Sequence, residues 1–193
     1  FQREYVEALI GSLNHLKVLE QKFNCVVANP PYMGSGNMNS TLSNFVKFYY
    51  PDSKTDLMAC FIESGLGMLE PKGFMGMINQ HSWMFLGSYE KLRINLLNSL
   101  HFDTLLHLGA RTFPEIGGEV VQNTAFTIWK VISKKNGVFF RLLDFENSEI
   151  KRIKTLEAIR NSNCGWYYKV NQKSFTKITS CPFGYWLNDS TLT

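Results

Sequence analysis

The chain of 193 residues lacks the features that would place it in several specialised classes of protein. No apolar run approaches 18 residues, so the sequence shows no membrane-spanning pattern, and no secretory signal opens it. Its four cysteines form no C-x-x-C pair, and its four histidines show no metal-ligand spacing. Cys25 and Cys60 lie in apolar segments, which predicts reduced, buried thiols in a cytoplasmic protein and argues against disulfides or zinc.

Charge is also scarce over most of the chain, with 19% charged and 45% hydrophobic residues and a net charge of +4. The exception is residues 134–177, which hold ten Lys or Arg against four acidic residues. A basic segment attracts phosphate backbones, and interleaved aromatic residues favour nucleic acid over a merely solvated surface. These aromatic residues are Phe139, Phe140, Trp166, Tyr167, Tyr168 and Phe175. No clustered acidic residues suit a two-metal nuclease.

The spacing of apolar residues predicts alternating helices and strands. Helices are expected over 3–20, 41–48, about 55–69, about 87–99 and 148–161. Strands are expected over 23–28, 74–79, 102–108, 120–132 and 138–144. Ser53 or Thr55 is the expected cap of the third helix, and Ser88 that of the fourth.

The alternation predicts an α/β fold with a mostly parallel sheet and helices on its faces. Asn136-Gly137 is typical of a tight turn, which predicts that strands 120–132 and 138–144 pair as an antiparallel hairpin.

The most informative motif is Asn29-Pro30-Pro31-Tyr32, directly after the apolar run 25–28. That run is typical of a buried strand, and open α/β sheets bind ligands at the carboxyl ends of their strands. The Asn29 side-chain oxygen and the carbonyl of Pro30 can accept the two hydrogens of an NH2 group. Pro30 and Pro31 stiffen the backbone and add no competing donors.

Tyr32 offers a ring face on which a flat group can stack, worth roughly 1–3 kcal/mol for a nucleobase. An NH2 group on a π-system is a poor nucleophile, because its lone pair is delocalised. Two acceptors that bind its hydrogens orient the lone pair toward an electrophile, so the catalysis implied is positioning without a strong base. The structural alternative is a polyproline-type turn with Tyr32 merely packed.

The tetrapeptide resembles the amino-methyltransferase signature, in which Asn, Asp or Ser precedes two prolines and an aromatic residue. Segments 27–34, 80–85, 107–113 and 117–122 sharpen the resemblance. Over roughly residues 20–130 the chain resembles N6-adenine DNA methyltransferases of the PglX type from BREX phage-defence systems and related restriction-modification enzymes. The expected sheet with its closing hairpin likewise resembles the class I, Rossmann-like methyltransferase fold.

The resemblance implies transfer of a methyl group from S-adenosylmethionine to an adenine flipped out of double-stranded DNA. Asn29 and Pro30 would then hold the amine, with Tyr32 on one face of the base. Phe113 is the best match to a second aromatic residue against the base, and a packed loop aromatic is the alternative.

His81 and Trp83 follow the strand that ends at Asn79, so both are candidates for lining the base pocket. A hydrogen-bonded histidine and a packed tryptophan are the structural alternatives.

No glycine-rich cofactor loop of the Phe-x-Gly-x-Gly kind and no ribose-binding acid precede the motif, and the resemblance places both upstream. Residues 1–147 are therefore expected to be the C-terminal half of a catalytic domain, with Asn29 contributing partly to the cofactor site. Residues 148–193 are expected to be a linker helix and the start of a target-recognition domain. The isolated chain is expected to be inactive and to self-associate through an exposed sheet edge. Defence-system proteins are further expected partners.

Two other functions stay open. A protein-glutamine or RNA amino-methyltransferase also uses Asn-Pro-Pro-Tyr, although the basic C-terminal part favours DNA. A non-catalytic DNA-binding fragment gains weight because the cofactor loop is missing from the sequence.

Overall fold

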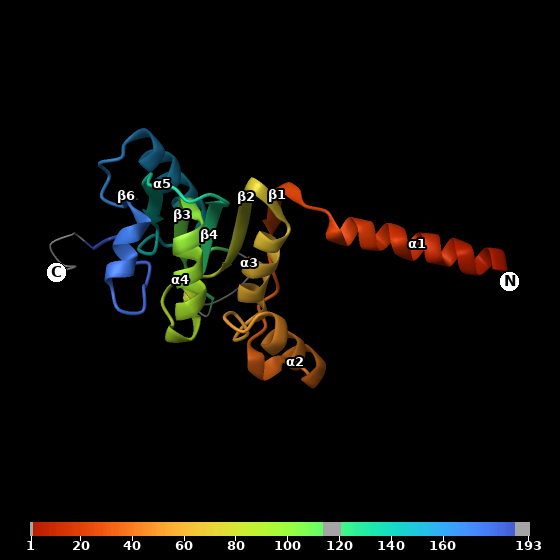
Figure 1. Ribbon diagram of the computed structural model, residues 1–193. Coiled ribbons are helices and arrows are strands. Elements are labelled where there is room, and N and C mark those ends of the chain that lie inside the picture. The colour runs from red at the N-terminus through yellow and green to blue at the C-terminus, as the bar shows by residue number, and fades with distance from the viewer. Residues whose placement is uncertain (1, 114–120, 188–193) are drawn as a thin grey trace.

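The computed structural model describes residues 2–113 and 121–187, and its centre is a six-stranded sheet in the order β1-β2-β4-β3-β5-β6 (Figure 1). The strands are β1 (Phe23–Ala28), β2 (Leu69–Gln80), β3 (His101–Gly109), β4 (Asn123–Trp129), β5 (Gly137–Arg141) and β6 (Tyr167–Val170). β1 is parallel to β2 and β3 is parallel to β5, whereas β4 and β6 are antiparallel to their neighbours. This sheet confirms the predicted α/β class, but it is mixed and not mostly parallel, because three of its five strand pairs are antiparallel.

The topology brings four strand ends to one edge of the sheet. β4 is antiparallel to both β2 and β3, so β2 and β3 run in the same direction. The carboxyl ends of β1, β2, β3 and β5 therefore share one edge, where ligands of open α/β sheets bind. In Figure 1, helix α2 (Ser40–Tyr49) lies beyond this edge, below the sheet.

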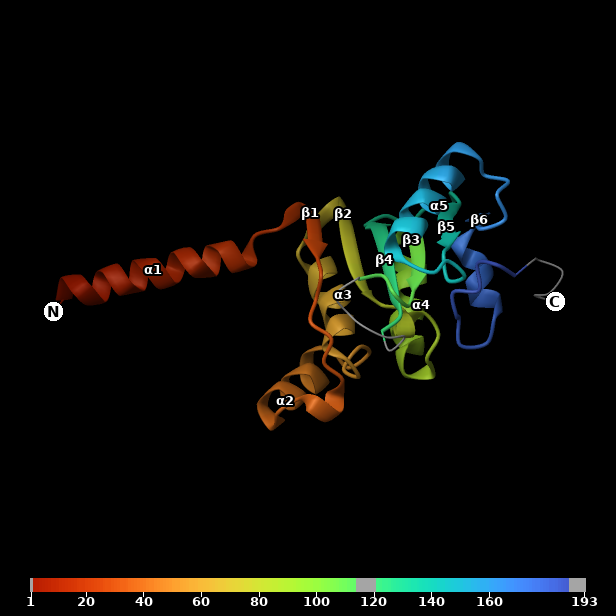
Figure 2. The ribbon, with the colours of Figure 1, turned by 180° about the vertical axis from the view of Figure 1, so that it is seen from behind.

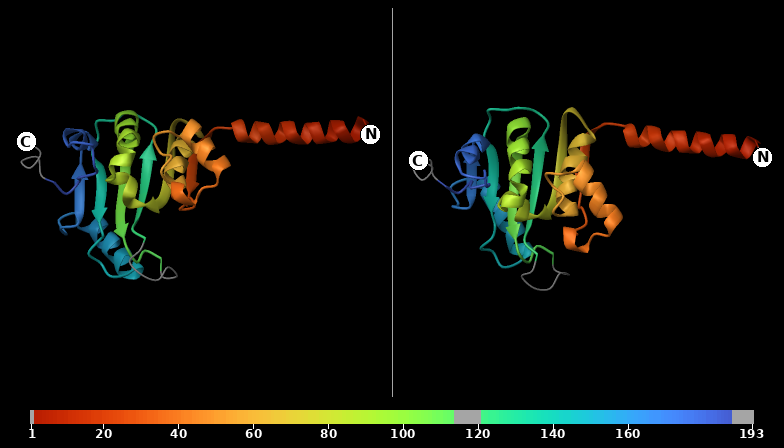
Figure 3. Two further views of the ribbon diagram at one scale, coloured as in Figure 1. Left: turned by 90° about the horizontal axis from the view of Figure 1, so that it is seen from below. Right: turned by 60° about the horizontal axis from the view of Figure 1, so that its bottom comes forward.

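Helices cover the two faces of the sheet unequally. Helices α3 (Leu57–Gly67) and α4 (Glu90–Ser99) lie on one face, and α5 (Ser148–Arg160) lies on the other (Figures 2 and 3). Helix α1 (Gln2–Glu20) extends away from the sheet, with its apolar side chains exposed. Among the described helices, none combines the length and the apolar character that a bilayer crossing requires.

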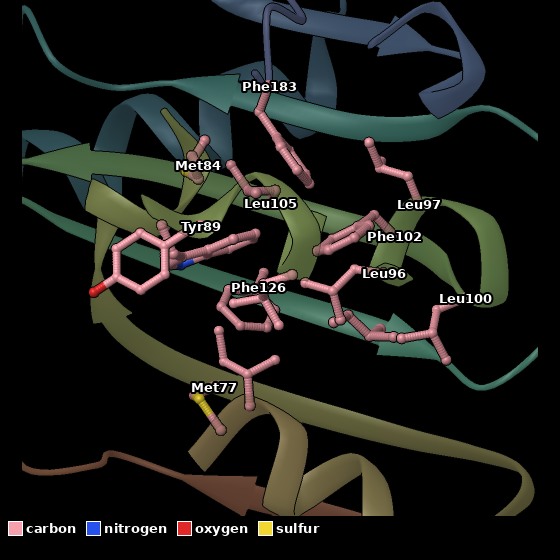
Figure 4. Packing of buried hydrophobic residues seen from close by; sticks show 14 of the residues in the cluster. Met77, Met84, Tyr89, Leu96, Leu97, Leu100, Phe102, Leu105, Phe126 and Phe183 are labelled. Atoms are coloured by element: carbon pink, nitrogen blue, oxygen red, sulfur yellow. The ribbon is translucent and has the colours of Figure 1, made fainter. Parts of the chain in front are cut away.

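The main core fills the space between the sheet and helices α3 and α4. Phe102, Phe126 and Phe183 surround the fully buried ring of Trp83, with ring centroids 5.1–5.9 Å from it. Figure 4 shows these phenylalanines gathered with Leu96 and Leu105 from neighbouring elements. Burial of such rings stabilises the fold by more than their buried apolar area predicts, because edge-to-face aromatic pairs attract one another.

β1 departs from the expectation of a buried strand. It is an edge strand, and 78% of the Val27 side chain is exposed. Cys25 is exposed as well, so the prediction of two buried thiols holds for Cys60 alone. The reason is that α5 covers the part of this face over β5 and part of β3, which leaves a groove of about 400 Å³ over β1, β2, β4 and the rest of β3.

The predicted hairpin between the last two strands is wrong. β4 is already paired on both sides, with β2 and with β3, so it has no edge left for β5. β5 pairs instead with β3 in parallel and with β6, a strand that the sequence analysis did not foresee. Asn136-Gly137 indicates a bend in the chain. The partner of β5 depends instead on which strand still has an unpaired edge, and that strand is β3.

The starts of two helices also differ from the prediction. Asp56 caps α3, because its Oδ1 atom accepts from the backbone N–H of Met58, whereas Ser53 is buried and binds Glu63. α4 begins at Glu90 after a single 3₁₀ turn over Gly87–Tyr89, and no side chain caps it.

The C-terminal part of the described chain packs on the same sheet. β6 extends the sheet, and Phe175, Phe183 and Tyr185 belong to the main core. Gln172 joins α4 to β3, because its Nε2 donates to the carbonyls of Leu97 and Leu100 and its Oε1 accepts from the backbone N–H of Phe102. The domain boundary between residues 147 and 148 stays a prediction.

Arg93 joins three segments from inside the protein. Its guanidinium is fully buried and donates to the carbonyls of Trp83, Leu86, Ser180 and Cys181. These contacts tie the C-terminal segment and the turn after β2 to helix α4. Burial lowers the pKa of Arg93, although an arginine stays charged at any ordinary pH.

We expect Arg93→Leu to destabilise the fold by about 3–5 kcal/mol, because four carbonyl groups would each lose a charged donor inside the core. Lys91→Leu, an exposed position on the same helix, is the control and should change stability by less than about 0.5 kcal/mol. Urea unfolding of the three proteins measures both effects. Equal unfolding midpoints would contradict this role of Arg93.

His107 is a second buried polar group, with 2% of its surface exposed. Its Nε2 atom lies 2.7 Å from Nδ1 of His81, and its Nδ1 atom lies 2.9 Å from the hydroxyl of Tyr185. Burial lowers the pKa of His107 from 6.5 to about 3, and the nearby His81 and Arg141 add to the shift. The imidazole is therefore neutral in the folded protein at ordinary pH.

This shift predicts acid lability with a defined sign. The unfolded chain binds a proton at His107 below about pH 6.5, whereas the folded chain does not until about pH 3. The contribution of neutral His107 to stability is therefore fully present above pH 6.5 and is lost as the pH falls toward 3. His107→Gln removes this titration, and its free energy of unfolding should fall less between pH 7 and pH 4.5. Denaturant titrations at both pH values measure these free energies of unfolding. An equal decrease between pH 7 and pH 4.5 in the wild type and in His107→Gln would refute the prediction.

Candidate active site at the carboxyl edge of the sheet

The Asn-Pro-Pro-Tyr motif leaves the sheet where the sequence predicts. β1 ends at Ala28, so Asn29 is the first residue beyond its carboxyl end. Asn29 and Pro31 are exposed, Pro30 is buried and Tyr32 is half-buried. An exposed carboxamide next to a buried proline leaves the amide oxygen accessible to a ligand at this edge.

The loop after the motif is fastened to the start of α3. Oδ1 of Asp56 accepts from the backbone N–H of Met33 at 3.1 Å and from that of Met58 at 3.0 Å. The Met33 carbonyl in turn accepts from the backbone N–H of Leu57 at 3.0 Å. One carboxylate thus caps a helix and anchors Met33, the residue that follows Tyr32, to the start of α3.

Tyr32 is held at its hydroxyl. The phenol donates to Oδ1 of Asn123 at 2.9 Å, and Asn123 is 1% exposed at the start of β4. Burial, followed by the charge of Asp56, raises the pKa of Tyr32, so the hydroxyl stays protonated and remains a donor. A tyrosine fixed at both its backbone and its hydroxyl presents its ring in a constant orientation.

His81 lies at the same edge of the sheet as this tyrosine. It follows Gln80, which faces Asn123 across the β2–β4 pair, and its backbone N–H donates to the carbonyl of Gln122 at 2.9 Å. Its ring is half-buried, contacts Phe85 edge-on and reaches His107. The structure therefore brings His81 to the edge that Tyr32 occupies.

Trp83 lies elsewhere. Its side chain is fully buried, its indole N–H donates to Oδ1 of Asn79 at 3.0 Å, and its ring packs in the main core. The packing alternative holds for this residue, and no role in contacting a substrate is proposed for it.

Phe113 is half-buried in the bend after β3, and the residues that follow it, 114–120, lie outside the described structure. The bend starts at Gly109, whose φ of +69° places it in the left-handed region that favours glycine. A Cβ there would meet the side chain of Leu143 at 2.6 Å, so the close packing at this turn also requires glycine.

The basic segment behaves differently from the expectation. Phe139, Phe140 and Phe175 are at most 4% exposed, so these aromatic residues form core and cannot stack on bases. Lys169, Lys173 and Lys177 line a cavity of about 520 Å³ next to β6. This cavity adjoins the amino end of β5, on the side of the sheet away from Asn29.

Cations also occur at the carboxyl edge itself. Lys151 reaches from α5 to the carbonyl of Ala110, just beyond β3, and burial lowers its pKa. Arg111 adjoins this contact and raises the positive charge there.

Three residues of this site escaped the sequence analysis. Asp56 had a usable signal, since an aspartate before an apolar helical run is typical of a helix cap. Asn123 and His107 had none, because their partners are 91 and 26 residues away and adjoin them only through sheet pairing. Within residues 2–113 and 121–187, no group of three or more His, Cys, Asp or Glu could hold a metal ion.

Comparison with known proteins adds close relatives. The chain is 42% identical over 177 residues to the adenine-specific methyltransferase PglX of Lacticaseibacillus casei (strain Zhang), which covers 91% of this chain and 15% of the relative. It is 43% identical over 189 residues to the adenine-specific methyltransferase BrxX of Escherichia coli O9:H4 (strain HS), which covers 96% of this chain and 15% of that protein. The chain thus spans about 15% of the length of these curated relatives.

A solved structure from Listeria monocytogenes, described as a class I S-adenosylmethionine-dependent methyltransferase, has the same fold. The match has a TM-score of 0.50 at 13% identity and covers 73% of this chain and 43% of the other. The class I fold that the sequence predicted is thereby confirmed. The model of the Eco57I restriction-modification methylase family matches residues 4–113, more than half of the chain. The chain therefore belongs to the Eco57I restriction-modification methylase family.

Proposed function

We propose that the protein containing this chain transfers a methyl group from S-adenosylmethionine to the N6 amine of adenine in double-stranded DNA. The observation that carries the proposal is the placement of Asn29-Pro30-Pro31-Tyr32 at the carboxyl end of β1, with the Tyr32 ring fixed through Asn123. The names of the relatives, adenine-specific methyltransferases, support adenine as the acceptor. We further propose that the protein acts within a restriction-modification or phage-defence system in the cytoplasm.

In this proposal the residues of the chain bind and orient the amine. The Asn29 amide oxygen and the Pro30 carbonyl accept its two hydrogens, which directs the nitrogen lone pair away from the ring plane. Tyr32 stacks on the flipped base, and stacking offsets part of the roughly few kcal/mol that unpairing costs. Phe113 is proposed to contact the base from the loop after β3.

The residues present fit the acceptor side of this reaction. S-adenosylmethionine, when bound, supplies an electrophilic methyl group, and Asn29, which is exposed at the end of the edge strand β1, is proposed to approach it. Arg111, an exposed cation just beyond the end of β3, is proposed to favour the approach of DNA phosphates to the same edge. Residues 148–193 are proposed to lead into a target-recognition domain.

We expect Asn29→Ala to lower methylation of DNA by about 100-fold or more, because one of the two acceptors that orient the amine is lost. The complete protein encoded with this chain is incubated with labelled S-adenosylmethionine and DNA, and N6-methyladenine is quantified. Asn37→Ala, an exposed asparagine in the loop after the motif, is the matched control and should retain activity. Label transferred to RNA or protein in place of DNA would refute the proposed substrate.

A double-mutant cycle tests the contact between Tyr32 and Asn123. Tyr32→Phe removes only the hydroxyl and Asn123→Ala removes the carboxamide that accepts from it, so each should lower kcat/KM by about 3- to 10-fold. Because both changes break one hydrogen bond, the double variant should lose no more than the worse single variant. Strictly multiplicative losses would show that the contact does not act in catalysis.

A further inference from the structure

Three polar side chains form a continuous hydrogen-bonded chain that the proposed chemistry leaves unused. The Tyr185 hydroxyl lies 2.9 Å from Nδ1 of His107, and Nε2 of His107 lies 2.7 Å from Nδ1 of His81. Tyr185 is 1% and His107 2% exposed, whereas His81 is half-buried. The chain therefore runs from the core outward and ends at the active-site edge.

The buried end fixes the direction of this chain. Within the described residues, the partner of the Tyr185 hydroxyl is Nδ1 of His107, and a buried hydroxyl hydrogen without an acceptor is costly. Tyr185 therefore donates, so Nδ1 of His107 is the acceptor and the ring proton of His107 sits on Nε2. That proton is donated to Nδ1 of His81, which leaves the proton of His81 on its outer nitrogen, Nε2.

Two further observations support this assignment. Burial raises the pKa of Tyr185, which keeps its hydroxyl protonated, and burial lowers the pKa of both histidines, which keeps them neutral. The rings are also held in place by packing, since Phe85 contacts both imidazoles and Phe139 stacks on Tyr185. The outer nitrogen of His81 is thus an N–H donor in a fixed orientation and carries no lone pair for proton abstraction.

The donor lies at the same sheet edge as the proposed base site. His81 is one residue beyond Gln80, which faces Asn123, the residue that binds the hydroxyl of Tyr32. A neutral N–H at this edge needs a hydrogen-bond acceptor. A bound nucleotide offers two kinds, a ring nitrogen of the flipped adenine or a phosphate oxygen beside it.

We propose that His81 is a substrate-binding residue, locked by Tyr185 and His107 as a hydrogen-bond donor to an acceptor atom of the target nucleotide. Tyr185 and His107 are positioning residues in this proposal, since they act through His81. The proposal rests on the proposed function and adds a specific contact to it.

The test pairs protein variants with altered substrates. The methylation site of the complete protein is first mapped, and duplexes are made with 1-deaza-, 3-deaza- or 7-deazaadenine at the target or with a methylphosphonate on either side. Each is assayed with the wild type, His81→Phe and Tyr185→Phe. Circular dichroism spectra confirm that the variants fold, and His81→Gln, which keeps a donor, serves as the conservative variant.

We expect one substrate change to lower kcat/KM of the wild type by about tenfold and to leave His81→Phe unaffected. The position of that change identifies the acceptor as a ring nitrogen or a phosphate. Tyr185→Phe should show a weakened response to the same substrate, and His81→Gln should recover part of it. A merely structural role for the three residues predicts equal responses to every substrate.

The result that would overturn the proposal is the same loss for each altered duplex in the wild type and in His81→Phe. Wild-type rates in His81→Phe on unmodified DNA would do so as well. Failure of the wild type to methylate any DNA would refute the proposed function itself, together with the contact built on it. This outcome is distinguished from failure of the His81 contact alone, because it is seen with the wild type on unmodified DNA.

Discussion

The insertion of β4 between β2 and β3 is the constraint on which the site depends. Because β4 is antiparallel to both β2 and β3, these two strands run in the same direction on either side of it. Their carboxyl ends therefore lie at one edge of the sheet. The same strand begins with Asn123 and Thr124, which face Gln80 and His107. A different position for β4 would remove the partner of Tyr32 and separate His81 from the motif.

Buried polar groups hold the remaining segments to this sheet. Arg93 and Gln172 each satisfy backbone carbonyls from distant parts of the chain, and both are at most 2% exposed. Such groups stabilise a fold only when every donor finds its acceptor, so they select one packing of the C-terminal segment over others that would bury the same apolar area. That selection also fixes Tyr185, and through it His107 and His81.

The site therefore consists of neutral hydrogen-bonding groups that neighbouring residues hold in place. The motif contributes an amide oxygen and a carbonyl, neither of which titrates, and its tyrosine is kept protonated by burial and by Asp56. The histidines nearby are neutral for the same physical reason, since a low-dielectric surrounding disfavours the charged imidazole. The motif and the two histidines at this edge thus offer neutral hydrogen-bonding groups, as expected where positioning replaces acid–base catalysis.

The sequence alone determined the fold class, the end of β1 at residue 28 and the motif beyond it, because these follow from local apolar spacing and from proline chemistry. It also placed His81 at the right strand end. It could not determine the partner of β5, the exposure of Cys25 or the burial of Trp83, since each depends on which edge or face another element has already covered. The Tyr32–Asn123 contact and the Tyr185–His107–His81 chain belong entirely to the tertiary structure, because residues up to 91 positions apart meet there only through sheet order and packing.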